Sequence, residues 1–199
     1  MFKTASGVTI PFTDKIKEEF EVSDRGIAFN MSIEKLGSFL CEFLDMLTEP
    51  MFFVLEVPLN QNEEEKLRKD DTYPFHKKVC YLDGQSKEQI KSILNQYGEL
   101  LLNDGILQFA FYSHDTMEGI YIRKYKLAYI FSQNPSRHFE MLQKYGIVQT
   151  DKLVTVWDTF THEAPGQARS IKVDSIDAYI LLDELKKLGM YEAKVIGDR

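Results

Sequence analysis

Apolar and polar residues follow two different spacings along the chain, and these spacings predict both helices and strands. Between residues 33 and 47, apolar residues recur every three or four positions, which is the pattern of a helix with one buried face. Residues 51–59 are apolar almost without interruption, which is typical of a buried strand. The hydrophobic pattern therefore predicts a helix followed directly by a strand.

Residues that favour helix ends divide the rest of the chain. Ser86 and Gln89 have the spacing of a capping box, in which each side chain accepts a hydrogen bond from the backbone of the other residue. Asn134 and Pro135 are a typical helix start, because a proline in the first helical turn lacks only an N–H that would be unpaired there anyway. We expect helices within residues 13–20, 32–47, 86–97, 134–146 and 174–189, and a solvated helix or loop at 62–71.

Strands are predicted where β-branched and aromatic residues gather between turn signals. Residues 119–131 form the longest such stretch, which is either one central strand or a hairpin with its turn near 124–126. The other predicted strands cover 27–31, 51–59, 75–82, 106–112, 153–160 and 168–173, and a short strand at the end of the chain. Because strands and helices do not alternate strictly, we expect an α+β fold, with a largely antiparallel or mixed sheet flanked by about four to five helices.

Two segments of the chain resemble each other. Residues 93–115 and 141–163 align without a gap, and both run from a helix end through Tyr-Gly to an aromatic–hydroxyl–His–acid tetrad. The similarity suggests a repeated helix–strand unit, 86–115 and 134–163, within a single domain of residues 1–199. Chance is the alternative, because only four aligned positions are identical.

The composition narrows the functional classes. Hydrophobic residues make up 44% of the chain, enough for an ordered core. The net charge of −7 disfavours nucleic acid and suits a basic protein partner, or simply solubility. One patch combines basic and aromatic residues, and we interpret it as the solvent face of a strand. It consists of Tyr121, Arg123, Lys124, Tyr125, Lys126 and Tyr129.

The location of the protein is predicted from its apolar segments and its cysteines. No stretch has the length of a signal-peptide core or of a membrane span, so we expect a cytoplasmic protein without a membrane partner. Cys41 and Cys80 lie in apolar segments and predict free, buried thiols in a reducing compartment.

Candidate catalytic residues come from the two tetrads, because the short motifs of nucleotide-binding proteins, metalloproteases and α/β-hydrolases are missing. His114 and Asp115 end the first tetrad, and His162 and Glu163 end the second. If the two pairs converge, they could bind zinc, iron or manganese, or act as general acid and base. The alternative is that both pairs are solvated turn residues, and we predict no cofactor and no metal.

The loop at 159–166 is the best candidate for a recognition segment, because loops on a rigid sheet often carry binding residues. The candidate binding residues in and next to it are Trp157, Asp158, Phe160, His162 and Glu163. A lone tryptophan within a strand is more often a core residue. His138, in the first turns of the helix that begins at Pro135, is expected to face solvent.

Three functional hypotheses follow. The first is a non-enzymatic protein-binding protein, for example of immunity or antitoxin type, which neutralises a basic nuclease by charge complementarity. The second is a small metal-dependent or acid–base hydrolase that uses the His–acid pairs. The third is a small-molecule sensor with a pocket between the sheet and a helix. We favour the first, and therefore expect no enzyme, because the chain is acidic and lacks cofactor motifs.

Overall fold

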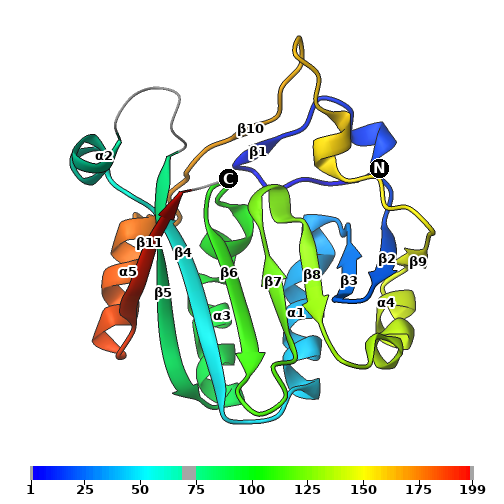
Figure 1. The fold of residues 1–199 in the computed structure, drawn as a ribbon, viewed down its shortest axis with the longest axis horizontal. Coiled ribbons are helices and arrows are strands. Elements are labelled where there is room, and N and C mark those ends of the chain that lie inside the picture. Colours follow the sequence, from blue (N-terminus) through cyan, green and yellow to red (C-terminus); the bar gives the residue numbers. More distant parts are fainter. Residues whose placement is uncertain (1, 69–74, 198–199) are drawn as a thin grey trace.

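A single large sheet organises the protein. The computed structural model describes residues 2–68 and 75–197 (Figure 1). The strands of the sheet are, in spatial order, β11 (Tyr191–Gly197), β5 (His76–Gln85), β4 (Met51–Pro58), β6 (Gln108–Ser113), β7 (Gly119–Ile122), β8 (Ala128–Phe131), β3 (Gly26–Phe29), β2 (Glu19–Ser23) and β9 (Val148–Gln149). Neighbouring strands are antiparallel, except for the parallel pair β2 and β9. Strands β1 (Val8–Thr9) and β10 (Gln167–Ala168) form a separate pair.

Helices cover one face of this sheet. The α-helices are α1 (Ile33–Met46), α2 (Gln61–Leu67), α3 (Lys87–Asn103), α4 (Phe139–Lys144) and α5 (Ala178–Lys187). The short 3-10 segments are η1 (Thr13–Lys15), η2 (Lys124–Lys126), η3 (Pro135–His138) and η4 (Val156–Thr159). Figure 1 shows α1 and α3 side by side behind the sheet, with α5 behind β11 and β5. The predicted α+β fold class is confirmed.

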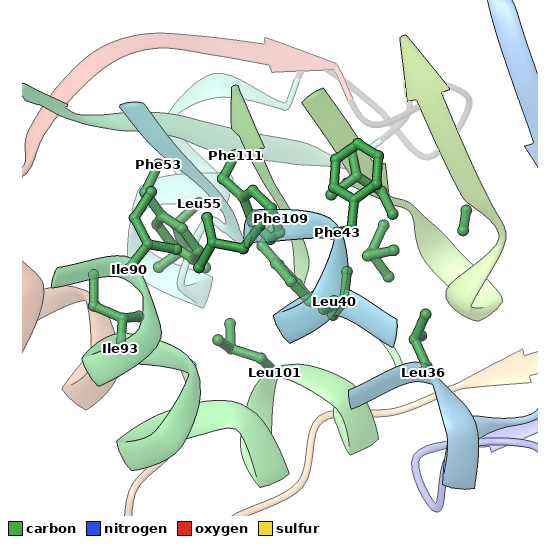
Figure 2. Close-up of a cluster of buried hydrophobic side chains, with 14 of the residues drawn as sticks. Leu36, Leu40, Phe43, Phe53, Leu55, Ile90, Ile93, Leu101, Phe109 and Phe111 are labelled. Atoms are coloured by element: carbon green, nitrogen blue, oxygen red, sulfur yellow. The ribbon is translucent and has the colours of Figure 1, made fainter. Parts of the chain in front are cut away.

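The main core lies between the central strands and helices α1 and α3. Successive side chains of a strand point to opposite faces, so Phe53 and Leu55 of β4 face the helices while Val54 between them does not. Figure 2 shows these side chains together with those that meet them from neighbouring strands and from the helices. All of the following are at most 3% exposed: Leu36, Leu40, Phe43, Phe53, Leu55, Ile90, Ile93, Leu101, Phe109 and Phe111.

Capping and turn residues in the sequence predicted several elements that the structure contains. Ser86 Oγ accepts a hydrogen bond from Gln89 N–H at 3.2 Å, and Gln89 Oε1 accepts one from Ser86 N–H at 2.8 Å, so the capping box forms at the start of α3. Of the two structures expected for the stretch 119–131, the hairpin forms, with η2 as its turn. Helix α2 forms at the start of the charged segment 62–71, of which residues 69–71 lie outside the described residues.

Four elements differ from the prediction. The strand expected at 168–173 is limited to β10, the two residues Gln167–Ala168. The helix expected at 13–20 is only the turn η1, because Phe20 belongs to β2 and pairs with Phe29 across a hairpin. The last helix begins at its N-cap Asp177, and not at residue 174 or 175. The strand expected at 153–160 is replaced by η4, since Asp158 Oδ2 accepts hydrogen bonds from Thr155 N–H at 2.8 Å and from its hydroxyl at 2.7 Å. These bonds close a helical turn.

The two similar segments therefore fold differently. In the first, α3 is followed by β6 in the middle of the sheet. In the second, α4 is followed by the two-residue edge strand β9 and then by η4. The helix–turn part of the similarity is structural, but the strand part is not.

Strand β11 at the other edge carries a bulge. Glu192 pairs with Cys80 and Lys194 pairs with Val79, so Ala193 is an extra residue without a partner of its own on β5. Beyond the bulge, Lys194 and Ile196 point to the sheet face that α1 and α3 do not cover. No helix of the described residues is both long and apolar enough to cross a membrane.

Substitution by alanine is expected to lower stability at one glycine, Gly26, and to raise it at another, Gly98. Gly26 has a φ of +131°, and a Cβ there would lie 2.0 Å from the Ile130 carbonyl oxygen. Gly26→Ala is therefore expected to lower the free energy of unfolding by roughly 2 kcal/mol or more.

Gly98 lies within α3 with open space around its Cα. Gly98→Ala should raise the free energy of unfolding by about 0.5–1 kcal/mol. Urea denaturation of both variants measures this, and equal effects would contradict the register of β3 and β8.

Candidate functional site

The sheet face opposite the helices is apolar as well. On β4, the residues between the core side chains are Phe52 and Val54, which are 8% and 6% exposed although no described helix crosses this face in Figure 1. They are buried by their neighbours within the sheet. Phe52 pairs with Tyr112 of β6, with the ring centroids 5.3 Å apart, and lies 5.9 Å from the Tyr81 ring of β5. We call this uncovered side of β11, β5, β4, β6, β7, β8 and β3 the open face.

Short side chains at the centre of the open face form the floor of a hollow. Val54 and Ala110 are paired across β4 and β6, and Val79 lies on β5 beside them. Larger side chains surround this floor, so a concavity of about 460 Å³ results, which we call the first hollow. Its lining residues are Phe52, Val54, Glu56, Val79, Tyr81, Ala110, Tyr112, Met117, Tyr121, Phe131, Lys194 and Ile196. This volume lies in the range of typical ligand pockets, roughly 300–1,000 Å³.

A second hollow of about 280 Å³ adjoins the first and shares Tyr121 and Phe131 with it. It lies over β8 and the β2–β3 hairpin. Two guanidinium groups line it, those of Arg25 and Arg123. The Arg123 guanidinium carbon lies 6.0 Å from the Tyr121 ring centroid and 5.8 Å from that of Tyr129. Contacts at this distance hold a cation against ring faces while leaving its N–H donors free to bind.

Few polar groups reach the first hollow. Lys77 Nζ lies 2.5 Å from Glu56 Oε2, so the two side chains form an ion pair. Burial, followed by the nearby Glu56 carboxylate, raises the pKa of both Tyr112 and Tyr121. Both phenols are therefore neutral at physiological pH, and the Tyr121 hydroxyl donates to Gln108 Oε1 at 3.3 Å. The open face thus presents rings and neutral hydroxyls.

The structure does not bring the two His–acid pairs together. His114 follows β6, its ring 4.9 Å from the Phe52 ring and its Nε2 3.9 Å from Asp83. His162 and Glu163 are exposed in the segment between η4 and β10, which lies at the opposite end of the sheet in Figure 1. Asp115 is exposed in the β6–β7 turn. Within residues 2–68 and 75–197, no group of three or more His, Cys, Asp or Glu side chains is placed to hold a metal ion.

The candidate binding residues around Trp157 form a small aromatic cluster. The Trp157 ring lies 4.8 Å from Tyr125 and 5.5 Å from Phe160, centroid to centroid. Its side chain is 49% exposed, so the expectation of a core tryptophan is wrong, because η4 replaces the strand that would have buried it. Asp158 serves as the partner of Thr155 in the capping of η4.

The basic and aromatic patch is divided among three places, which corrects its interpretation as one strand face. Lys126 is buried, and its Nζ donates to the carbonyls of Leu101 and Leu107 at 2.9 and 3.1 Å. Burial lowers the pKa of Lys126 to about 8. Tyr125 belongs to the Trp157 cluster. Tyr121, Arg123 and Tyr129 lie on the open face.

His138 is fully buried, which contradicts the expected solvent position. Its Nε2 lies 2.8 Å from Glu118 Oε1, while Arg137 Nη1 donates to Glu118 Oε2 at 2.9 Å. The Ser132 hydroxyl also donates to Glu118, at 2.8 Å. These bonds attach η3 to the start of β7, so the histidine has a structural role. Sequence spacing could not reveal it, because Glu118 is distant in the chain.

The two cysteines are free thiols, as predicted. Cys80 is buried, and burial raises the pKa of its thiol to about 11, so it is a poor nucleophile at neutral pH. Cys41 on α1 is half-buried, which corrects the expectation that both thiols are buried.

Comparisons of the chain with protein-family models, with curated proteins and with solved structures found no match. The site must therefore be judged by its own residues.

The sequence did not predict the open face, because we interpreted 51–59 as a buried strand and did not ask whether both of its faces are covered. The available signal was the set of aromatic residues at alternate positions of neighbouring strands, such as Tyr112, Tyr121 and Tyr129.

The buried His138 makes stability depend on pH. Burial lowers its pKa below the ordinary value, and the Glu118 carboxylate opposes this only in part. Above about pH 6.5 the imidazole is neutral in both states; below it, the unfolded chain binds a proton that the folded protein resists. The free energy of unfolding should therefore fall as the pH drops from about 7 to about 5.

Urea denaturation at several pH values measures this effect. His138→Gln keeps a hydrogen-bond donor for Glu118 but does not titrate. Its free energy of unfolding should therefore fall less between about pH 7 and about pH 5 than that of the wild type. His162→Gln, at an exposed position, should keep the wild-type decline. Identical slopes for all three proteins would show that His138 does not contribute.

Proposed function

We propose that the protein is a non-enzymatic binding protein that recognises another protein through its open face. The observation that carries this proposal is an uncovered sheet face with apolar floor residues, aromatic rims and two adjoining hollows. Strong contacts of protein interfaces are concentrated where a side chain of one partner fills an apolar pocket of the other. Tyrosine lines both hollows and arginine lines the second, and these two residue types are enriched among the strong contacts of protein interfaces.

The groups on the open face suit recognition better than catalysis. The one carboxylate in the first hollow, Glu56, is ion-paired with Lys77. The raised pKa values of Tyr112 and Tyr121 keep their hydroxyls as neutral hydrogen-bond partners. The hydrolase hypothesis needed His114 and His162 in one site, and their segments lie at opposite ends of the sheet. An immunity or antitoxin role in the cytoplasm is one form of the proposed class, and the free thiols support a reducing compartment.

A small-molecule sensor is the second candidate, favoured by the size and apolar lining of the first hollow. The sequence placed such a pocket between the sheet and a helix, whereas the hollow lies on the side without helices. A thermal-shift screen of metabolites tests this candidate, because a ligand at about 100 times its Kd raises stability by roughly 2.7 kcal/mol.

Paired substitutions on and off the open face test the protein-binding proposal. Met117 and Tyr129 lie at the hollows, whereas Leu188 and Tyr179 belong to the α5 region. Met117 and Leu188 are similarly exposed, at 60% and 62%. The double variant Met117→Ser, Tyr129→Ser should weaken binding of a co-purified partner about tenfold or more, since interface anchors contribute more than about 1 kcal/mol each. The matched variant Leu188→Ser, Tyr179→Ser should bind like the wild type.

The measurement has two steps. The partner is first isolated at low salt with the full chain as bait and identified, and its affinity for each purified variant is then determined by calorimetry. Circular dichroism checks that both double variants fold. Equal affinities of the two variants, or the lack of any partner together with a hit in the metabolite screen, would rule the proposal out.

A further inference from the structure

The lining of the two hollows is positively charged although the chain as a whole is negative. The net charge is −7. Arg25, Arg123 and Lys194 nevertheless line the two hollows, against a single carboxylate, that of Glu56. Glu56 is already paired with Lys77. In the described part of the chain, none of the three lining cations forms a salt bridge, so their charge is available to a partner.

Cations on the helical side are in a different situation. Lys91 of α3 lies 2.6 Å from Asp45, Lys144 of α4 lies 2.8 Å from Glu42, and Lys187 of α5 lies 2.7 Å from Glu184. These pairs neutralise charge locally. A chain with more acids than bases could have paired the cations of the open face in the same way. It instead leaves them beside an apolar hollow.

The position of Arg123 suits the binding of a carboxylate that belongs to a partner molecule. The rings of Tyr121 and Tyr129 hold its side chain on the open face. A guanidinium held in this way keeps the planar fork of N–H donors that matches two carboxylate oxygens. Arg25 contributes to the same hollow, and Lys194 extends the positive charge to the other side of the first hollow.

We infer that the open face binds an acidic protein surface, one that inserts an apolar or aromatic side chain into the first hollow and places carboxylates near Arg123, Arg25 and Lys194. The inference rests on the proposed function and names the chemistry of its partner. It replaces the expectation of a basic partner, because charges within about 8–10 Å of an interface act on the partner more strongly than a distant net charge in physiological salt.

Single-stranded nucleic acid is the other anionic chain that could meet aromatic side chains on a sheet. Two observations favour a protein. The floor of the first hollow consists of the aliphatic residues Val54, Val79 and Ala110, which accept a side chain but offer no ring on which a base could stack. Three unpaired cations are also few for a polyanion that must approach a chain of net charge −7.

Three peptides of matched length test the partner chemistry on the full chain. They are acetyl-Glu-Glu-Trp-Glu-Glu-amide, the same peptide with serine for glutamate, and the same peptide with lysine for glutamate. Their binding is followed by ¹⁵N NMR chemical-shift changes at low and at physiological salt. The acidic peptide should shift signals of β4, β6, β7 and β8 at low salt and bind at least about threefold more tightly than the serine peptide. The lysine peptide should bind most weakly.

Charge reversal links the effect to the named residues. Arg123→Glu should remove the preference for the acidic peptide, and added salt should weaken that preference in the wild type. Lys66→Glu is the control, because it makes the same charge change on the exposed surface of α2, away from the hollows. Its preference should equal that of the wild type.

Several outcomes would overturn the inference. They are no shift with the acidic peptide, equal binding of the three peptides, the tightest binding of the lysine peptide, or displacement of the acidic peptide by a short oligothymidylate at lower concentration. The proposed function fails separately. Suppose that a partner fails to bind the double variant Met117→Ser, Tyr129→Ser and yet binds Arg123→Glu more tightly than it binds the wild type. This result would support the proposed function and rule out an acidic partner.

Discussion

The packing of α1 and α3 against β4 and β6 is the contact on which the rest of the structure depends. Phe53, Phe109 and Phe111 point into this layer and meet Phe43 and Leu40 from α1. Since side chains alternate along a strand, fixing these residues on the helical side also fixes which residues lie on the other side. The core therefore positions the open face without contacting any molecule that binds there.

The open face combines short residues at its centre with large rings around it. Ala110 and Val54 leave space that Tyr112, Tyr121 and Phe131 enclose, and the rings bury one another enough to stay ordered without a covering helix. The distribution of charge follows a second rule. On the helical side, Asp45 and Glu42 of α1 each form a salt bridge with a lysine, whereas the cations that line the hollows form none within the described residues. Net charge alone is thus a poor guide to the surface that a partner meets.

The parts of the fold that the sequence predicted are those set by neighbouring residues. The capping box of Ser86 and the hairpin at 119–131 depend on contacts within a few positions. The burial of His138 depends on Glu118, and the place of β4 between β5 and β6 depends on pairings far apart in the chain, so neither could be predicted from local spacing. Residues 153–160 were misread because the Thr155–Asp158 bonds outweigh the strand preference of their apolar residues. The candidate site was not predicted because an apolar strand has the same sequence pattern whether helices cover one of its faces or both.

The bulge in β11 also bears on how the sheet ends. Among the described strands, β11 has a neighbour on one side only, β5, so the backbone groups of its other side have no strand to pair with. An edge of this kind can pair with a strand of a second chain and lead to aggregation. Ala193 interrupts the regular spacing of these groups and increases the local twist, so an incoming strand cannot form an unbroken ladder along β11. The bulge therefore protects this edge of the sheet against unwanted strand pairing.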